Sequence, residues 1–376
     1  MSPPRHVMLN ALYLDPEVSG GPETYLRGLA PALAAAYPDL RLTVATTASG
    51  AAALRADGWE DFAGLRAFPC EDGQKVRRQW AEQVLLPRAA SVGRAEILHS
   101  LSSLAPLHPG TRSVVTLHDV TFLIRPTFGR LTTLGMGFLV KAAARRADAL
   151  IAGSAAARDE TCALLNVDPG RFSVVHHGHE HTGASAPTPE AEIRARQDLG
   201  ARRVILCVAA IRPHKNQATL IRAAAELDED TVVVLAGHAE PYELELRALT
   251  RDLGLEDRIR FAGYVSSEEL EGLWRIASCA AFPTLGEGFG IPVIEALAHG
   301  LPVAASDLPV LREVGGELPY FFDPGDPHAA ARAIGRALDD TRTAELGPAR
   351  AAMFSWEAAA HATHEVYERV LSRGGA

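Results

Sequence analysis

Short apolar runs alternate with longer amphipathic segments along almost the whole chain, and this alternation limits the possible folds more than any other feature. The short runs are continuous in Val, Ile, Leu and Ala, as strands buried on both faces are. Strands that alternate with helices predict an α/β protein with parallel sheets covered by helices on both sides. In the first half the predicted strands are residues 7–14, 42–46, 65–68, 97–99, 113–117, 149–152 and 172–176. The predicted helices are 23–36, 51–57, 74–90, 131–146 and 155–165, and Pro87 is expected to interrupt the helix 74–90.

A stretch of small residues and prolines, residues 182–189, interrupts the alternation and is the best candidate for a linker. A chain of 376 residues is also too long for one core. We therefore predict two doubly wound, Rossmann-like domains at residues 1–183 and 184–355, and a final helix within 356–376 that packs towards the first domain. In the second half the predicted strands are 204–208, 232–236, 259–261, 279–282, 302–305 and 320–322, and the predicted helices are 217–227, 242–253, 267–276, 292–299, 327–338 and 356–371.

Composition excludes several classes of protein. A net charge of −9 argues against general nucleic-acid binding. The four cysteines (Cys70, Cys162, Cys207 and Cys279) form no C-x-x-C pair, which favours reduced, buried thiols over disulfides or a zinc site. The first residues lead directly into an apolar strand, and no apolar run is long enough to span a bilayer, so we expect a cytoplasmic protein.

The stretch 282–300 carries the strongest functional signal. An apolar strand enters a glycine-rich turn, which opens a helix with Pro292 in its first turn and Gly300 at its end. The positive end of a helix suits a phosphate, and Gly288 and Gly290 allow a ligand close to the backbone. Two carboxylates, Glu287 and Glu295, accompany this turn, and carboxylates bind vicinal hydroxyls well. A sugar nucleotide offers a phosphate and hydroxyls together.

This frame resembles a known family signature. Glu287 and Glu295, separated by seven residues within G-E-G-F-G-I-P-V-I-E-A-L-A-H-G-L-P-V, are similar to the donor site of retaining, GT-B-fold glycosyltransferases of family 4 (glycosyl transferases group 1). Several other stretches resemble the family in the same order along the chain: Gly20-Gly21, the segment 117–122 with His118 and Asp119, the loop 211–216, the segment 235–237 and the segment 261–265. The resemblance implies a GT-B fold, in which two Rossmann-like domains face each other across a cleft.

The resemblance also implies roles for individual residues. Lys215 would neutralise the departing diphosphate, Glu287 would position the hydroxyls of the transferred sugar, and His118 would line the cleft close to that sugar. Glu295 would bind the ribose, and Val265 with its neighbour would border the base. Backbone N–H groups for the diphosphate and sugar would come from Gly288, Phe289, Gly290 and Ile291, and the glycine loop from Gly20 and Gly21.

One position departs from the family pattern. The family often carries an arginine five residues before the loop lysine, and Ala210 stands there in this chain. Arg212 is a candidate for the second positive charge, either beside Lys215 or in place of the missing arginine.

The activity implied is a metal-independent, retaining transfer from a nucleotide-diphosphate sugar, a UDP- or GDP-sugar first of all, to a hydroxyl of a glycan, glycolipid or small natural product. Two other classes stay open at this stage. One is a non-catalytic nucleotide-sugar binder, and the other is an epimerase or phosphorylase of the same fold. The sequence carries no signal for an oligomeric state.

Three further motifs have an ordinary interpretation that we favour. Asp228-Glu229-Asp230 has the D-x-D form of a metal site, but a solvated turn fits its place before a strand. The histidine-rich segment 176–181 could bind a metal, although a loop lining the cleft is favoured. The basic helix within 74–94 could touch a membrane peripherally, but an amphipathic helix packed on its own domain is favoured.

Overall fold

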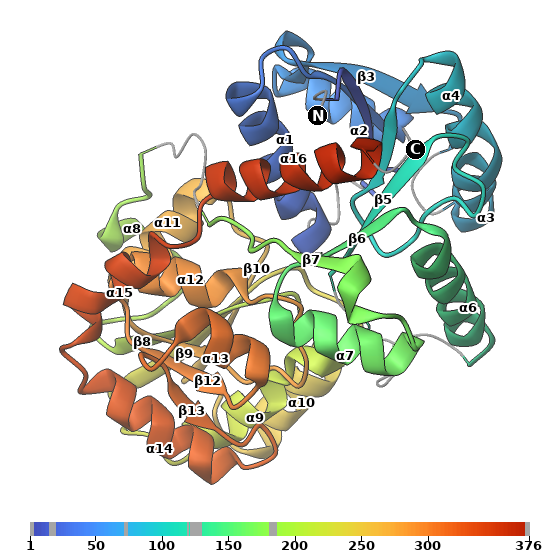
Figure 1. The fold of residues 1–376 in the computed structure, drawn as a ribbon. Coiled ribbons are helices and arrows are strands. Elements are labelled where there is room, and N and C mark those ends of the chain that lie inside the picture. Colours follow the sequence, from blue (N-terminus) through green and yellow to red (C-terminus); the bar gives the residue numbers. More distant parts are fainter. Residues whose placement is uncertain are drawn as a thin grey trace. The chain divides into compact units, whose positions relative to one another are not determined.

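The structure is a computed structural model that describes residues 4–14, 20–70, 74–118, 120, 130–179 and 186–372. It forms two compact units: unit 1 contains Met1–Glu180 and Ser355–Ala376, and unit 2 contains His181–Phe354. Each unit is one parallel sheet with helices on its faces, so the predicted α/β class is confirmed (Figure 1). Part of the predicted linker, residues 182–185, lies outside the described residues. Within the described residues, no helix is both long and apolar enough to cross a membrane.

The sheet of unit 1 has seven parallel strands in the order β3-β2-β1-β4-β5-β6-β7. The chain moves outwards from β1 in one direction and then restarts at β4 in the other, so the order reverses between these two neighbours. The strands are β1 His6–Asn10, β2 Arg41–Thr47, β3 Ala63–Phe68, β4 Ile97–Ser100, β5 Arg112–Leu117, β6 Ala149–Ala152 and β7 Phe172–Val174. The predicted strand 7–14 is too long, because β1 ends at Asn10. Residues 11–14 form a turn instead, closed by the hydrogen bond from Leu14 N to Ala11 O.

Helices cover both faces of this sheet: α1 Gly21–Ala36, α2 Ala48–Ala56, α3 Lys75–Trp80, α4 Leu86–Val92, α6 Arg130–Arg146, α7 Ala155–Leu165 and α16 Trp356–Ser372. The last helix, α16, packs along α1 (Figure 1). The Trp356 ring fills the space that a side chain at Gly28 would need. The predicted helix 74–90 is broken at a different place from the one expected. A π-helical turn, Ala81–Leu85, separates α3 from α4, whereas Pro87 lies in the first turn of α4, where its missing N–H is tolerated.

A chain of buried polar side chains crosses the core of unit 1. The Tyr25 hydroxyl lies 3.3 Å from Thr116 Oγ1, and His99 Nε2 lies 2.8 Å from the same oxygen. His99 Nδ1 lies 2.7 Å from the hydroxyl of Tyr367 on α16. Burial, with a smaller contribution from the charge of His118, lowers the pKa of His99 from 6.5 to about 3. The imidazole is thus neutral in the folded protein at any ordinary pH.

Acidification is expected to destabilise the protein through this histidine. Unfolded His99 titrates near pH 6.5, so below that pH the unfolded state binds more protons than the folded state, and stability falls until the folded pKa near 3 is reached. Between pH 7 and pH 5 the loss from this one group is about 2 kcal/mol. Urea midpoints at both pH values measure it, and His99→Gln should lose less than the wild type. An equal drop in the two proteins would assign the effect to other groups.

The sheet of unit 2 has six parallel strands in the order β10-β9-β8-β11-β12-β13. They are β8 Arg203–Val208, β9 Thr231–Ala236, β10 Ile259–Gly263, β11 Ala277–Phe282, β12 Val303–Ser306 and β13 Tyr320–Phe322. The helices are α8 Glu190–Arg196, α9 Gln217–Ala224, α10 Glu243–Asp252, α11 Ser267–Ile276, α12 Ile291–Ala298, α13 Pro309–Gly315, α14 Pro327–Leu338 and α15 Thr343–Ala351. Three of these were not predicted. In α8 and α13 the apolar pattern is too short to show a helical period. In α15 the proline at position 348 argued against a helix, although the helix continues through it.

Candidate functional site

The candidate site of unit 2 lies where its strand order reverses. β8 and β11 are neighbours in the sheet, and the chain continues from β8 towards β9 on one side and from β11 towards β12 on the other. Residues 209–216 and 283–290 leave the carboxyl ends of these two strands and lie side by side at this edge of the sheet. Ligands of open parallel sheets bind at such a point.

Hydrogen bonds join these two loops into one rigid unit. The carbonyl oxygen of His214 accepts from Leu285 N at 2.8 Å and from Thr284 Oγ1 at 3.1 Å. The Asn216 side chain donates to Pro283 O and Pro324 O, both at 2.9 Å. Asn216 has a φ of +57°, which asparagine tolerates better than most residues, and α9 begins at the next residue. The loop that carries Lys215 is thus fixed on the loop that carries Glu287.

Lys215 and Glu287 form an ion pair across this junction. The distance from Lys215 Nζ to Glu287 Oε2 is 2.6 Å, and the side chains are 23% and 21% exposed. Both groups are accessible from solvent but partly desolvated, so the pair is stronger than a fully exposed one. A polyanion carrying hydroxyls could bind here by taking Lys215 for its anionic part and Glu287 for its hydroxyls.

The glycine turn leads directly from this pair into α12. Gly290 caps the helix with a φ of +96°, which favours glycine, and a Cβ there would also lie 2.7 Å from Leu311 Cδ2. Phe289 is buried against the ring of Phe354, Gly288 precedes it in the turn, and Ile291 is the first residue of α12. Glu295 lies on α12 one helical turn after Ile291 and is only 6% exposed.

Arg212 lies in the same loop as Lys215 but turns to another partner. Its Nε lies 2.5 Å from Glu240 Oε1 in the loop after β9. The carbonyl of Ala210 accepts a hydrogen bond from the Gln217 side chain at 3.0 Å. Lys215 therefore contacts Glu287, while Arg212 ties the site to the loop after β9.

Two aromatic rings stand at the next strand ends. His238 follows β9 and Tyr264 follows β10, and their rings stack with centroids 4.5 Å apart. Tyr264 is exposed, and Val265 next to it is half-buried. Such a platform at the carboxyl edge of the sheet suits a planar base.

The predicted residues of unit 1 lie at the carboxyl edge of their own sheet. Gly20 caps α1, and a Cβ on Gly20 or Gly21 would meet no atom of the described residues within 4 Å. His118 follows β5, and its Nε2 lies 2.7 Å from Leu101 O, so Nε2 carries the proton because a carbonyl can only accept. The Tyr25 ring on α1 packs edge-on against His118. Asp119 lies outside the described residues.

The acidic motif 228–230 and the histidine-rich segment 176–181 are the two motifs for which the sequence left a metal site open. Asp228-Glu229-Asp230 precedes β9, at the opposite end of the strand from the candidate site. His177 is buried, packs on Tyr25 and Trp356, and has a pKa held well below its usual value by burial and by neighbouring histidines. Across residues 4–372, apart from those outside the description, no group of three His, Cys, Asp or Glu could hold a metal ion. All four cysteines are free, and Cys162 is half-buried rather than buried as expected.

Several residues of the site have no clear signal in the sequence. His214 acts through its backbone carbonyl, and Thr284 and Glu240 act through partners distant along the chain. Asn216 had a local signal, because an asparagine directly before a helix often marks a special backbone conformation.

Comparisons with known proteins agree with this arrangement. The family model described as "Glycosyltransferase Family 4" matches residues 19–182, and the one described as "Glycosyl transferases group 1" matches residues 189–351. D-inositol 3-phosphate glycosyltransferase of Corynebacterium jeikeium is 35% identical over 237 residues, which are 57% of this chain and 54% of that protein. The O-antigen chain mannosyltransferase RfbU of Salmonella typhimurium is 28% identical over 221 residues, covering 58% and 59%. The chain thus spans little more than half the length of these curated relatives.

Solved structures share the fold over the whole chain. Anabaena HepE in complex with UDP and glucose gives a TM-score of 0.76 at 21% identity and covers 97% of this chain and 100% of that one. Sucrose-phosphate synthase from Thermosynechococcus elongatus gives 0.78 at 21% identity and covers 98% and 100%. The fold predicted from the glycine-rich signature is therefore confirmed.

Proposed function

Because this chain belongs to the GT-B glycosyltransferases of family 4, glycosyl transferases group 1, we propose that it moves a sugar from a nucleotide-diphosphate sugar to an acceptor hydroxyl. The transfer retains the anomeric configuration and needs no metal ion. The acceptor is a glycan, a glycolipid or a small natural product. The observation that carries the proposal is the Lys215–Glu287 ion pair at the point where the strand order reverses, next to the N-terminus of α12.

The reaction breaks the bond between the anomeric carbon and a diphosphate oxygen. Positive charge develops on the sugar ring and negative charge on the leaving diphosphate, so fixed cations and N–H dipoles aimed at the diphosphate lower the barrier. Lys215 and the first turn of α12 supply both.

The ion pair also suggests how the donor is received. Without a ligand, Glu287 balances the charge of Lys215 at 2.6 Å. A bound diphosphate takes Lys215 as its partner, and Glu287 turns to accept hydrogen bonds from the sugar hydroxyls. The exchange keeps a partner for each charge, so neither is left desolvated alone.

Glu295 is proposed to bind the ribose hydroxyls, and Val265 with the His238–Tyr264 platform to border the base. The donor is a nucleotide-diphosphate sugar, and UDP and UDP-glucose are the first probes because HepE structures contain them. Stabilisation in a thermal-shift series with UDP, GDP, ADP and dTDP identifies the base.

Glu295→Ala is expected to weaken UDP binding by about 10- to 100-fold, because a carboxylate that accepts hydrogen bonds from hydroxyls contributes about 1.5–3 kcal/mol. Pyrophosphate, which lacks a ribose, should bind equally to the variant and the wild type. Calorimetric titration with both ligands measures the contrast, and Glu245→Ala on the exposed face of α10 is the matched control. Equal weakening of both ligands would contradict the assignment to ribose.

A further inference from the structure

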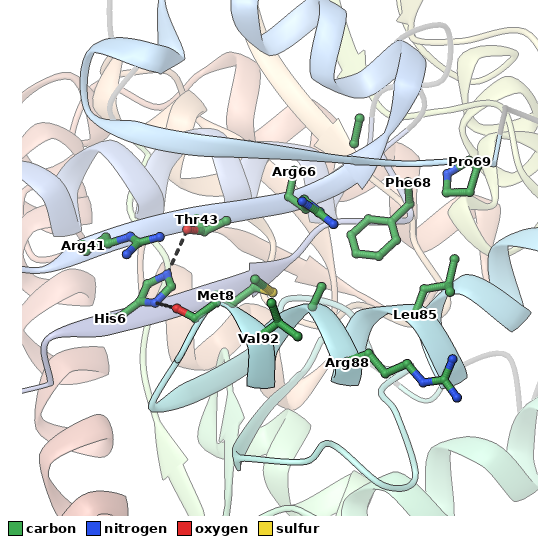
Figure 2. A pocket seen from close by; sticks show the side chains of 13 residues that line it. His6, Met8, Arg41, Thr43, Arg66, Phe68, Pro69, Leu85, Arg88 and Val92 are labelled. Carbon is green, nitrogen blue, oxygen red and sulfur yellow. Dashed lines mark hydrogen bonds between the residues drawn. The ribbon is translucent and has the colours of Figure 1, made fainter.

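A pocket of about 390 Å³ lies in unit 1 between α4 and the face of β1, β2 and β3 (Figure 2). It extends along the strands from His6 and Arg41, at the amino ends of β1 and β2, to Phe68 and Pro69 at the far end of β3. None of its lining residues belongs to the Lys215–Glu287 site or to the predicted residues Gly20, Gly21 and His118.

Three exposed arginines line this pocket and give it a strong positive charge. Arg41 and Arg66 come from the neighbouring strands β2 and β3, and Arg88 comes from α4 opposite them (Figure 2). No aspartate or glutamate is among the lining residues, and within the described part of the chain none of the three arginines forms an ion pair. The chain as a whole carries a net charge of −9, so this cluster runs against the general balance. Such a cluster attracts an anion.

The floor of the same pocket is apolar and neutral. Met8 and Phe68, which are buried, form the floor. Leu85 and Val92 line the helical wall, and Val92 is 86% exposed. The His6 ring is held in the pocket wall, because its Nδ1 lies 3.1 Å from Gly93 O and its Nε2 lies 2.9 Å from Thr43 Oγ1. Burial and the charge of Arg41 also lower the pKa of His6. An anion without an apolar part would leave this floor in contact with water.

We propose that this pocket binds an amphiphilic phosphate ester, with the phosphate between Arg41 and Arg66 and the hydrocarbon part on Phe68, Leu85 and Val92. Guanidinium groups match the geometry and charge of phosphate oxygens, and alkyl carbon gains from leaving water at the apolar floor. This inference goes beyond the transfer reaction and does not depend on it. The chemistry is shared by lipid headgroups and by soluble phosphate monoesters.

Hexyl phosphate is the probe, measured by isothermal titration calorimetry on the full chain. It should bind the wild type at least tenfold more tightly than inorganic phosphate or hexanol, because neither of these can use both the arginines and the floor. The double variant Arg41→Ala/Arg66→Ala should lose at least tenfold in affinity. Arg146→Ala, which removes an exposed arginine of α6, should bind like the wild type. Equal affinity in the double variant, or inorganic phosphate binding as tightly as the ester, would overturn the proposal.

A sedimentation assay then separates the two sources of the ligand. If the source is a lipid headgroup, vesicles of phosphatidylcholine with one-fifth phosphatidylglycerol carry the wild type down, and the double variant stays in the supernatant. If the source is a soluble ester, neither protein sediments although hexyl phosphate still binds the wild type. Sedimentation of both proteins alike would contradict a role for these arginines at a membrane. UDP binding should be unchanged in the double variant, so failure here is distinguishable from failure of the donor-site assignment.

Discussion

Lys215→Ala is expected to lower the rate of sugar transfer by about 100- to 1,000-fold, because one fixed charge aimed at a leaving group in a partly dry site has an effect of this size. Arg212 in the same loop does not replace it, since Arg212 is held by Glu240 at 2.5 Å. The measurement is the release of the nucleoside diphosphate from the identified donor, with and without acceptor, on protein with an unchanged melting temperature. Glu287→Gln is expected to lower the rate as well, because an amide accepts hydrogen bonds from the sugar more weakly than a carboxylate.

Lys141→Ala provides the matched control for this variant. Lys141 lies on α6 of unit 1 and is half-buried, so its removal tests the loss of a lysine as such. A rate close to that of the wild type in Lys215→Ala and in Glu287→Gln would contradict the site. If the wild type releases nucleoside diphosphate and the two variants do not, a non-catalytic binder is also excluded.

Gly237→Ala is expected to destabilise the protein by about 3–5 kcal/mol, in the range of the most damaging single substitutions. Gly237 follows β9 with a φ of +156°, and a Cβ there would collide with Ala209 O and lie 2.9 Å from Ala210 N. These are backbone atoms of the loop that carries Lys215, so no side chain can turn aside to make room. Urea midpoints measure the loss, and nucleotide binding should weaken along with stability.

Gly335→Ala is the control, with the opposite sign expected. Gly335 lies inside α14, and a Cβ there meets nothing within 4 Å. Alanine should therefore stabilise the protein by about 0.5–1 kcal/mol through its better helix propensity. A similar loss of stability in both variants would contradict the prediction that the close backbone contact at Gly237 causes the destabilisation.

The sequence was sufficient to predict the two parallel sheets, because strands buried on both faces and helices with a regular apolar stripe have distinct periods. It was also sufficient to predict the glycine turn, where Gly290 is needed for local backbone reasons. It could not show that Arg212 turns to Glu240 or that His214 holds Thr284, since those contacts join segments far apart in the chain. The break at Ala81 was missed because proline was the only visible signal for a kink.

The order of synthesis has a particular meaning for unit 1, since its core contains a helix that is synthesised after every strand of both sheets. α16, 17 residues long, supplies Trp356 against Gly28 and the Tyr367 hydroxyl to His99. A nascent chain that has emerged only to Phe354 therefore contains every strand of both sheets, but its helix α1 still lacks the contact of Trp356 at Gly28. All of unit 2 therefore precedes α16 along the chain, and unit 1 gains its last core contacts only when α16 has been added.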